Sequence, residues 1–90
     1  MYSIEFTENA LLGMAKLKKS EPQRYKKLES LIEELKVHPT TGTGKPEQLK
    51  GTSEPTWSRR ISEKHRLVYK IEEEKVVVFV LSTYGHYDDK

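Results

Sequence analysis

The stretch Trp57-Ser58-Arg59-Arg60-Ile61-Ser62-Glu63-Lys64-His65-Arg66-Leu67-Val68-Tyr69 decides how the rest of this chain is interpreted. It alternates apolar and polar residues, with the period of two that is typical of β-strands with one buried face. Within it lie four basic residues and a histidine, namely Arg59, Arg60, Lys64, Arg66 and His65. Strands that hold several cations on an exposed face suit a negatively charged ligand, so we expect a basic surface here.

Length and composition limit the class of protein. The chain has 90 residues, the size of one small domain, so we expect residues 1–90 to form a single domain. The absence of cysteine excludes disulfides and thiolate metal sites and favours an intracellular protein. Residues 1–6 lack the basic and apolar regions of a signal peptide, and no apolar run is long enough to cross a bilayer. We therefore expect a soluble, intracellular protein with no membrane association.

The net charge of +2 is unevenly distributed along the chain. Residues 41–70 carry seven Lys or Arg against three Asp or Glu, whereas residues 71–90 carry two against five. The basic excess therefore lies on the stretch quoted above and on the loop before it. An excess of this size fits a polyanion partner and an ordinary solvated surface about equally well.

The first twenty residues predict a short strand followed by a helix. Residues 3–6 alternate in the manner of a strand. Thr7 is a good N-cap residue for a helix from Glu8 to about Lys19, along which the apolar residues follow a helical period. Gly13 weakens this helix, because glycine has a low helix propensity.

A second helix is predicted more clearly. Ser20 and Gln23 have the spacing of a capping box at its start. Pro39 marks its end, since proline disfavours the helical conformation at the residue before it. The apolar residues of this helix share one face: Tyr25, Leu28, Leu31, Ile32 and Leu35. Two helices joined by so short a turn form an antiparallel hairpin, which can cover one face of a sheet.

The second half of the chain predicts a long connection and three strands. Residues 40–56 form the connection, and loops of that length inside a compact domain tend to be functional. Strands follow at about residues 57–63, 66–72 and 75–82. Residues 76–81 are continuously apolar, which predicts a strand buried on both faces, central in the sheet or beside the first strand. The order is β-α-α-β-β-β, an α+β domain with a two-helix hairpin on one face of a mostly antiparallel sheet.

The sheet face without helices should be concave and basic, and the residues expected near it suit cleavage of RNA by its own 2′-hydroxyl. That reaction needs a base for the hydroxyl, cations for the developing phosphorane charge and an acid for the leaving 5′ oxygen. Glu47 in the long connection is a candidate base. Arg66, together with Arg59 or Arg60, is a candidate charge clamp. His86 is a candidate acid, because imidazole titrates close to neutral pH.

Each of these residues also has a simpler interpretation. Tyr87 is a further candidate, because it can stack on a base or position a phosphate. Glu47, however, lies in a loop, and a loop glutamate is usually a solvated charge. His65, between two cations, is more typical of a protein surface than of a catalytic site. The three histidines lack the spacing of metal ligands, so no metal site is predicted, and nothing predicts a cofactor. These residues alone favour plain RNA or protein binding over RNA cleavage.

Taken together, three blocks of the sequence resemble the YoeB/Txe toxins of the RelE superfamily. The blocks are Gly44-Lys45-Pro46-Glu47-Gln48-Leu49-Lys50, the stretch from Trp57 to Tyr69, and His86-Tyr87 near the end. They occur in the family's order and at similar spacing. The resemblance implies a RelE-like fold and a toxin of a bacterial type II toxin–antitoxin pair, an mRNA interferase that cuts messenger RNA in the A site of the 70S ribosome. It also implies a YefM-like antitoxin as partner, and a homodimer.

The resemblance further assigns roles to particular residues. The family's catalytic positions fall on Glu47, Arg66, His86 and Tyr87, which favours Arg66 among the arginines. The residues that would bind messenger or ribosomal RNA are Lys45, Lys50, Arg59, Arg60, Lys64 and His65. The chain departs from the family by continuing with Asp88-Asp89-Lys90 after the His-Tyr pair. Two carboxylates beside His86 would favour its charged form and repel RNA.

Two other functions stay open. One is a RelE-superfamily toxin that inhibits gyrase and does not cut RNA. The other is a non-catalytic module that binds RNA or protein. The presence of Glu47 and Arg66 together with the His86-Tyr87 pair argues against the first, and retention of function without His86 would favour the second.

Overall fold

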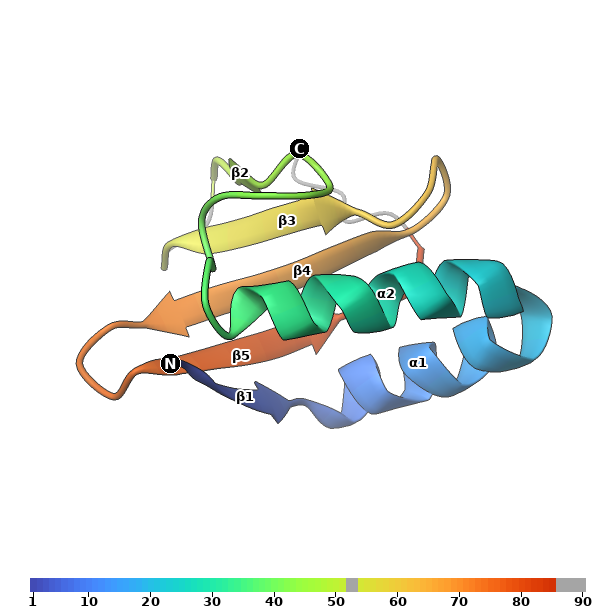
Figure 1. Cartoon of the computed structure of the whole chain (residues 1–90), viewed down its shortest axis with the longest axis horizontal. Helices are drawn as coiled ribbons and strands as arrows, with labels where there is room; N and C mark the ends of the chain where they lie inside the picture. Colours follow the sequence, from blue (N-terminus) through green and yellow to red (C-terminus); the bar gives the residue numbers. More distant parts are fainter. Residues whose placement is uncertain (52–53, 86–90) are drawn as a thin grey trace.

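The computed structural model describes residues 1–51 and 54–85. These residues form the elements β1 (Ser3–Phe6), α1 (Glu8–Ser20), α2 (Pro22–Leu35), β2 (Glu47–Gln48), β3 (Thr56–Arg60), β4 (Arg66–Glu72) and β5 (Val77–Ser82). The strands make one sheet in the order β1-β5-β4-β3-β2, in which β1 is parallel to β5 and the other neighbours are antiparallel. Both helices cover the same side of this sheet (Figure 1). The predicted α+β architecture is therefore confirmed.

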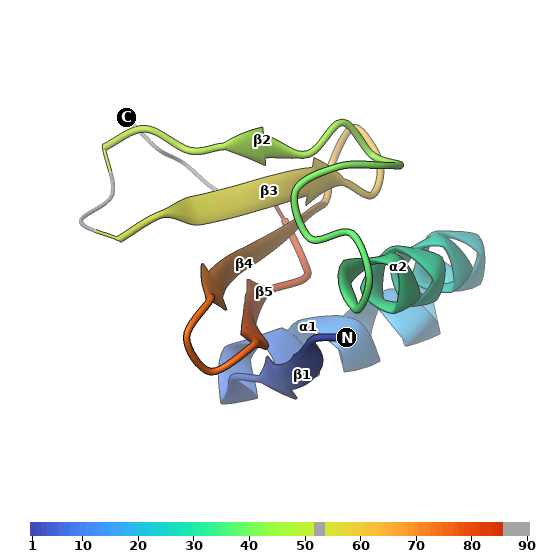
Figure 2. The same ribbon diagram turned by 60° about the vertical axis from the view of Figure 1, so that its left-hand side comes forward.

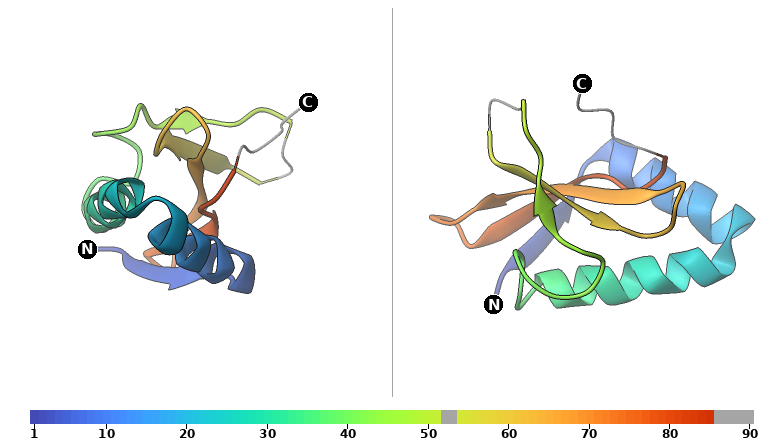
Figure 3. Two further views of the ribbon diagram at one scale, coloured as in Figure 1. Left: turned by 90° about the vertical axis from the view of Figure 1, so that its right-hand side faces the viewer. Right: turned by 90° about the horizontal axis from the view of Figure 1, so that it is seen from above.

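The core lies between the helical hairpin and the sheet. The left panel of Figure 3 shows the two helices packed on one side of the twisted sheet. The apolar face predicted for α2 is buried there, with Tyr25 half-buried at its edge. The residues that fill this core are Ala10, Leu17, Leu28, Leu31, Ile32, Leu35, Ile61, Leu67, Tyr69, Val78 and Val80. Burial of each large apolar side chain contributes roughly 1.5–3 kcal/mol, so this face fixes the hairpin on the sheet.

The junction between the helices differs from the predicted capping box. Ser20 is the last residue of α1, and its hydroxyl donates to the carbonyl of Lys16 at 2.8 Å. Glu21 ends α1 and begins α2 with no side-chain hydrogen bond to the helix start. The prediction that Ser20 and Gln23 cap the second helix is therefore wrong, because the serine hydroxyl is bonded within the preceding helix.

Two features of α1 have local explanations, namely its start at Thr7 and the glycine at position 13. Thr7 caps the helix as predicted, since its Oγ1 accepts the N–H of Ala10 at 3.1 Å. A Cβ added to Gly13 would lie 2.5 Å from Thr83 Oγ1. The Thr83 hydroxyl donates to the carbonyl of Ala10 at 2.8 Å. Gly13 thus weakens the helix but lets α1 approach Thr83 closely.

The strand predicted at residues 57–63 ends early, at Arg60. Residues 61–65 form a turn instead, in which the N–H groups of Ile61 and Ser62 both donate to the carbonyl of His65, at 3.0 and 3.1 Å. The Ser62 hydroxyl accepts the N–H of His65 at 3.2 Å. These local bonds compete with the strand ladder and close the hairpin between β3 and β4.

The last strand occupies the predicted position, between β1 and β4. It begins at Val77 because Val76 has φ of 55°, a left-handed conformation that does not continue a strand. Val78 and Val80 are buried against the helices, whereas Val77 and Phe79 are only half-buried. The prediction of burial on both faces is therefore wrong for the face turned away from the helices.

A fifth strand, β2, lies inside the connection that the sequence predicts as a loop. Gly44 and Lys45 have successive positive φ values of 86° and 51°, which turn the chain sharply before β2. Glu47 then pairs with Ser58, and Gln48 with Trp57. Figure 2 shows β2 beside β3 at the edge of the sheet.

Arg59 is the largest departure from the sequence prediction, which placed it among the exposed cations. The pairing of β3 with β4 sets Arg59 opposite Leu67, on the side that faces the helices, and the whole residue is buried. Each of its five N–H groups donates a hydrogen bond. The acceptors are the Tyr69 hydroxyl, the Glu34 carboxylate and the main-chain carbonyls of His38, Thr41 and Thr43.

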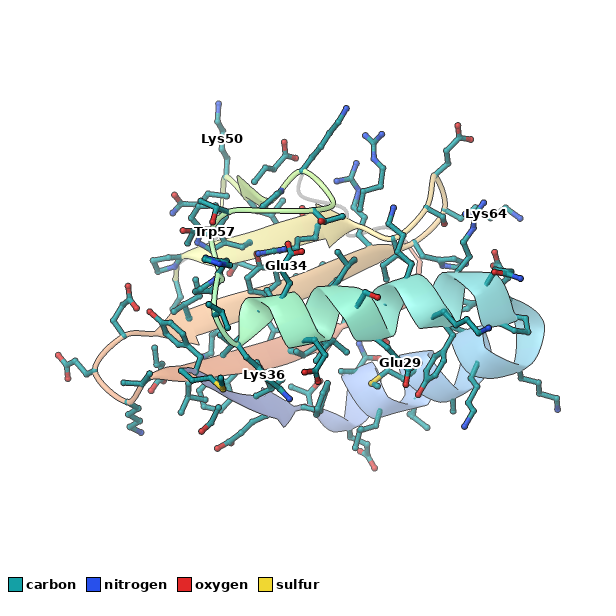
Figure 4. All side chains as sticks on the ribbon, viewed as in Figure 1. Glu29, Glu34, Lys36, Lys50, Trp57 and Lys64 are labelled. Carbon is teal, nitrogen blue, oxygen red and sulfur yellow. The ribbon has the colours of Figure 1, made fainter. Side chains whose placement is uncertain are left out.

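Glu34 completes this buried network. Its Oε1 lies 2.5 Å from Nη1 of Arg59 and also accepts the N–H of Thr43 at 2.6 Å. Figure 4 shows Glu34 on the side of α2 that faces β3. The Tyr69 hydroxyl accepts from Arg59 at 3.2 Å and donates to the carbonyl of Pro39 at 2.7 Å. The network thus fastens α2 and residues 38–43 to the sheet.

Arg59→Ala should lower the free energy of unfolding by about 3 kcal/mol, because it leaves the Glu34 carboxylate without its cation and three main-chain carbonyls without their donor. Urea unfolding followed by the fluorescence of Trp57 measures the change. Arg60→Ala is the matched control, since the neighbouring arginine is exposed and should contribute less than about 0.5 kcal/mol. Equal losses in the two variants would contradict this account of Arg59.

The same network makes stability depend on acidic pH. Burial raises the pKa of Glu34, but the hydrogen bonds from Thr43 and Arg59 outweigh it and hold this pKa below its ordinary value of 4.5. A carboxyl group with a lowered folded pKa contributes stability that is present above its unfolded pKa and is lost as the pH falls through its folded pKa. Glu34→Gln should therefore flatten the acid-side decline in the free energy of unfolding below pH 4.5. Urea unfolding at a series of pH values tests this, and an unchanged decline would count against it.

Candidate active site

The candidate site lies on the face of β2, β3 and β4 that is turned away from the helices. In antiparallel strands, residues directly opposite each other share a face. Glu47 is opposite Ser58, Ser58 is opposite Val68, and Arg60 is opposite Arg66. Because side chains two residues apart on one strand also share a face, these five residues point to the same side of the sheet, where Ser58 and Val68 are buried and Glu47 and Arg60 are exposed. We call this side the open face.

Glu47 and Arg66 are brought together on the open face. Oε1 of Glu47 lies 4.0 Å from Nη1 of Arg66, the outer limit of an ion pair. The Glu47 side chain is 66% exposed and that of Arg66 is 26% exposed. The carboxylate is therefore accessible to a ligand, while the guanidinium is partly fixed by its surroundings. A carboxylate and a cation so placed can accept a proton and neutralise a phosphate on the same ligand.

The position of Glu47 follows from how the chain enters and leaves β2. The carbonyl of Gly44 accepts the N–H of Arg60 at 2.7 Å. After β2, the N–H of Leu49 donates to the carbonyl of Thr56 at 2.7 Å. Glu47 is thus held against β3 by main-chain bonds on both sides of it, in a segment only two residues long.

Exposed basic residues lie before and after β2, at the end of β3 and in the β3–β4 turn. Lys45, Lys50, Arg60 and Lys64 are all exposed. Figure 4 shows Lys50 and Lys64 projecting outward from the β2 edge and from the β3–β4 turn. These four side chains are available to a polyanion, as the sequence predicts. Arg59 is not, because all five of its donors are used inside the protein.

His65 also differs from its predicted surface position, since it is only 4% exposed. Its Nε2 lies 2.7 Å from Oε2 of Glu21, and its Nδ1 accepts the N–H of Gly85 at 2.8 Å. The ring packs against that of Tyr84, with 4.3 Å between the centroids. Both ring nitrogens therefore have partners within the protein and do not face the solvent.

The predicted catalytic residues His86 and Tyr87 lie outside the described residues, as does the extension at residues 88–90. The described chain ends at Gly85, whose carbonyl accepts the N–H of Arg66 at 3.0 Å. Gly85 itself therefore lies next to one of the two residues of the candidate pair.

Ser58 is a residue of the open face that sequence reasoning missed. Its side chain is completely buried, and within residues 1–51 and 54–85 its hydroxyl has no hydrogen-bond partner. Such groups are uncommon in folded proteins, because a buried unpaired hydroxyl destabilises them. The alternation along β3 does place Ser58 on the same face as Arg60, but no sequence signal distinguishes an unpaired serine from a bonded one.

Other kinds of site find no support in the described part of the chain. No group of three or more His, Asp or Glu side chains there can hold a metal ion. Neither helix has the length and apolar character needed to cross a membrane. A depression of about 470 Å³, lined by residues that include Phe6, Met14 and Tyr25, adjoins the helices and does not include Glu47 or Arg66. Of the predicted catalytic residues, the described part of the chain brings Glu47 and Arg66 together, on the open face.

Ser58→Ala should raise the free energy of unfolding by about 1 kcal/mol, because it removes a buried hydroxyl that has no partner among the described residues. Thr83→Val is the matched control, since it removes a buried hydroxyl that donates to the Ala10 carbonyl and should lower the free energy by about 1 kcal/mol. Thermal and urea unfolding measure both changes. A loss of stability in both variants would show that Ser58 is bonded in solution.

Comparison with known proteins identifies relatives of this chain. Residues 6–87 match the family described as the YoeB-like toxin of bacterial type II toxin-antitoxin system. Toxin YoeB of Streptomyces coelicolor is 37% identical over 75 residues, which cover 83% of this chain and 89% of that protein. The solved YoeB/ParE toxin from Agrobacterium tumefaciens has a TM-score of 0.86 and 30% identity, covering 94% of this chain and 99% of that one.

Two structures from Staphylococcus aureus are also similar. The YoeB dimer has a TM-score of 0.82 at 29% identity, covering 96% of this chain and 98% of that one. The YoeB–YefM complex has a TM-score of 0.76 at 28% identity, covering 97% and 99%. The family match spans nearly the whole chain, and the fold and the resemblance in the three sequence blocks agree with it. The chain belongs to the family of YoeB-like toxins of bacterial type II toxin–antitoxin systems.

Proposed function

We propose that this YoeB-like toxin is a ribosome-dependent endoribonuclease, which cuts messenger RNA in the A site and so inhibits translation. The observation that carries the proposal is the placement of Glu47 and Arg66 within 4.0 Å of each other on the open face. A carboxylate base and a guanidinium clamp are two of the three groups that attack by a 2′-hydroxyl requires. Membership of the YoeB-like family supports the same chemistry.

In the proposed reaction Glu47 takes the proton of the 2′-hydroxyl. The 2′ oxygen then attacks the adjacent phosphorus, while the bond between phosphorus and the 5′ oxygen breaks. The products are a 2′,3′-cyclic phosphate and a 5′-hydroxyl end. DNA has no 2′-hydroxyl, so the reaction is confined to RNA.

Arg66 stabilises the negative charge that grows on the phosphate oxygens during this attack. Arg60 is opposite Arg66 on the open face and supplies a second cation. The exposed Lys45, Lys50 and Lys64 bind more distant phosphates of messenger or ribosomal RNA, which predicts salt-dependent affinity. Arg59 and His65 have no part in RNA contact here, because they are buried and bonded within the protein.

His86 is assigned the role of general acid that protonates the leaving 5′ oxygen. Tyr87 is assigned to the phosphate or to stacking on a base. Two observations support these roles. The family match extends through residue 87, and the described chain reaches Arg66 at Gly85.

Partners follow from the solved relatives. YoeB of Staphylococcus aureus is known as a dimer and in complex with YefM. For this chain we infer a cognate YefM-like antitoxin and a homodimer. The 70S ribosome is the inferred site of action, which places the activity in the bacterial cytoplasm.

Glu47→Ala, Arg66→Ala and His86→Ala should each reduce cleavage by about 100-fold or more, because each removes a group that acts in the transition state. The measurement is primer extension on a defined messenger programmed on purified ribosomes, with circular dichroism to verify folding. Lys75→Ala is the control, since this lysine is 73% exposed in the turn between β4 and β5 and should leave cleavage unchanged.

Undiminished cleavage by all three alanine variants would contradict the assigned residues. If the unmodified protein cuts no messenger on ribosomes, a DNA supercoiling assay separates the gyrase-inhibiting branch from a non-catalytic binding module. Equal cutting of free RNA would keep the chemistry and remove the requirement for the ribosome.

A further inference from the structure

His65 is a buried titratable residue that the proposed mechanism does not use. It stands directly before Arg66 in the sequence and is 4% exposed. Its two ring nitrogens contact two distant segments: Nε2 lies 2.7 Å from the Glu21 carboxylate, and Nδ1 lies 2.8 Å from the backbone nitrogen of Gly85. The side chain thus connects the junction of α1 and α2 with the last described residue of the chain.

These two contacts fix the tautomer of His65. A backbone N–H can only donate, so Nδ1 accepts from Gly85 through its lone pair and carries no proton. The ring proton then sits on Nε2 and is donated to Glu21. Glu21 therefore orients the imidazole so that its unprotonated nitrogen faces Gly85. The same carboxylate makes no capping bond to α2.

Several contacts among the described residues hold residues 83–85 in place, and His65 makes one of the two that hold Gly85. Thr83 is bound to α1 through its hydroxyl, and the Tyr84 ring packs on the imidazole. The carbonyl of Gly85 accepts from the N–H of Arg66 at 3.0 Å. The N–H of Gly85 is bonded to His65. Gly85 is thus held on one side by the main chain of β4 and on the other by His65.

We infer that His65 is a positioning residue for the cleavage reaction. By holding Gly85 beside Arg66, it fixes the residue that directly precedes His86 in the sequence. This inference rests on the proposed role of His86 as the acid. A general acid must come within hydrogen-bonding distance of the oxygen that it protonates, and a displacement of 1 Å can reduce a rate by about 100-fold. His65 itself contacts neither RNA nor the reacting atoms.

Two substitutions separate this role from a purely structural one. In His65→Asn the amide oxygen is as many bonds from the backbone as Nδ1, so the acceptor for Gly85 is kept and the donor to Glu21 is lost. In His65→Gln the amide nitrogen matches Nε2, so the donor to Glu21 is kept and the acceptor for Gly85 is lost. Each variant removes one hydrogen bond of His65 and the ring contact with Tyr84, so their stabilities should be similar.

The positioning role predicts different activities for the two variants. His65→Gln should lower the single-turnover rate on programmed ribosomes by about 100-fold, with the affinity for those ribosomes unchanged. His65→Asn should cut within a few-fold of the unmodified protein. Amide hydrogen exchange read by NMR should show Gly85 protected in the unmodified protein and in His65→Asn, and unprotected in His65→Gln.

Several results would overturn the inference. Equal loss of rate in the two variants, or equal retention, would show that His65 acts only through stability or not at all. Nitrogen-15 chemical shifts of the imidazole that place the proton on Nδ1 would contradict the tautomer from which the argument starts. If the unmodified protein cuts no RNA, the proposed function itself fails; if it cuts and both variants cut equally, only the role of His65 fails.

Discussion

The buried guanidinium of Arg59 is the interaction on which the rest of this structure depends. Residues 38–43 leave α2 without forming regular secondary structure, and three of their carbonyls have no strand or helix partner of their own. Arg59 supplies the donors for those carbonyls, and Glu34 balances its charge. A buried charge is tolerated only when it is paired and hydrogen-bonded, so the position of Arg59 depends on α2 and on this loop as well as on β3.

Successive side chains along β3 point to opposite faces of the sheet, so two neighbouring arginines have different roles. Arg59 points toward the helices and organises the chain that leads to β2, whereas Arg60 points to the open face, opposite Arg66. The open face can therefore carry the accessible Glu47 close to a cation, because the segment that delivers Glu47 is fixed from the other side of the sheet. Ser58 lies on the open face, and its buried hydroxyl has no hydrogen-bond partner among the described residues.

The sequence predicts the helices and most strands because their apolar residues repeat with a clear period. It also contains a signal for the burial of Arg59, which follows Trp57 and precedes Ile61 at the spacing of one strand face. The residue type predicts the opposite, because arginine is rarely buried without a partner. Its partner, Glu34, is distant in the sequence and does not reveal itself there. The two-residue β2 has no period to detect, and the burial of His65 depends on Glu21 and Gly85, which only the folded chain brings together.

The second helix connects both ends of the candidate site, and its role goes beyond covering the sheet. Glu34 near its C-terminal end holds Arg59 and the loop that leads to Glu47, whereas Glu21 at its start holds His65 and, through it, Gly85. A helix rises about 1.5 Å per residue, so the length of α2 sets the distance between these two carboxylates. One residue added to α2 would shift one carboxylate by about 1.5 Å and turn it by roughly a quarter of a turn. The loop that leads to Glu47 and the position of Gly85 are thus spaced by one rigid element, because Glu34 and the N-cap residue Glu21 lie at opposite ends of α2.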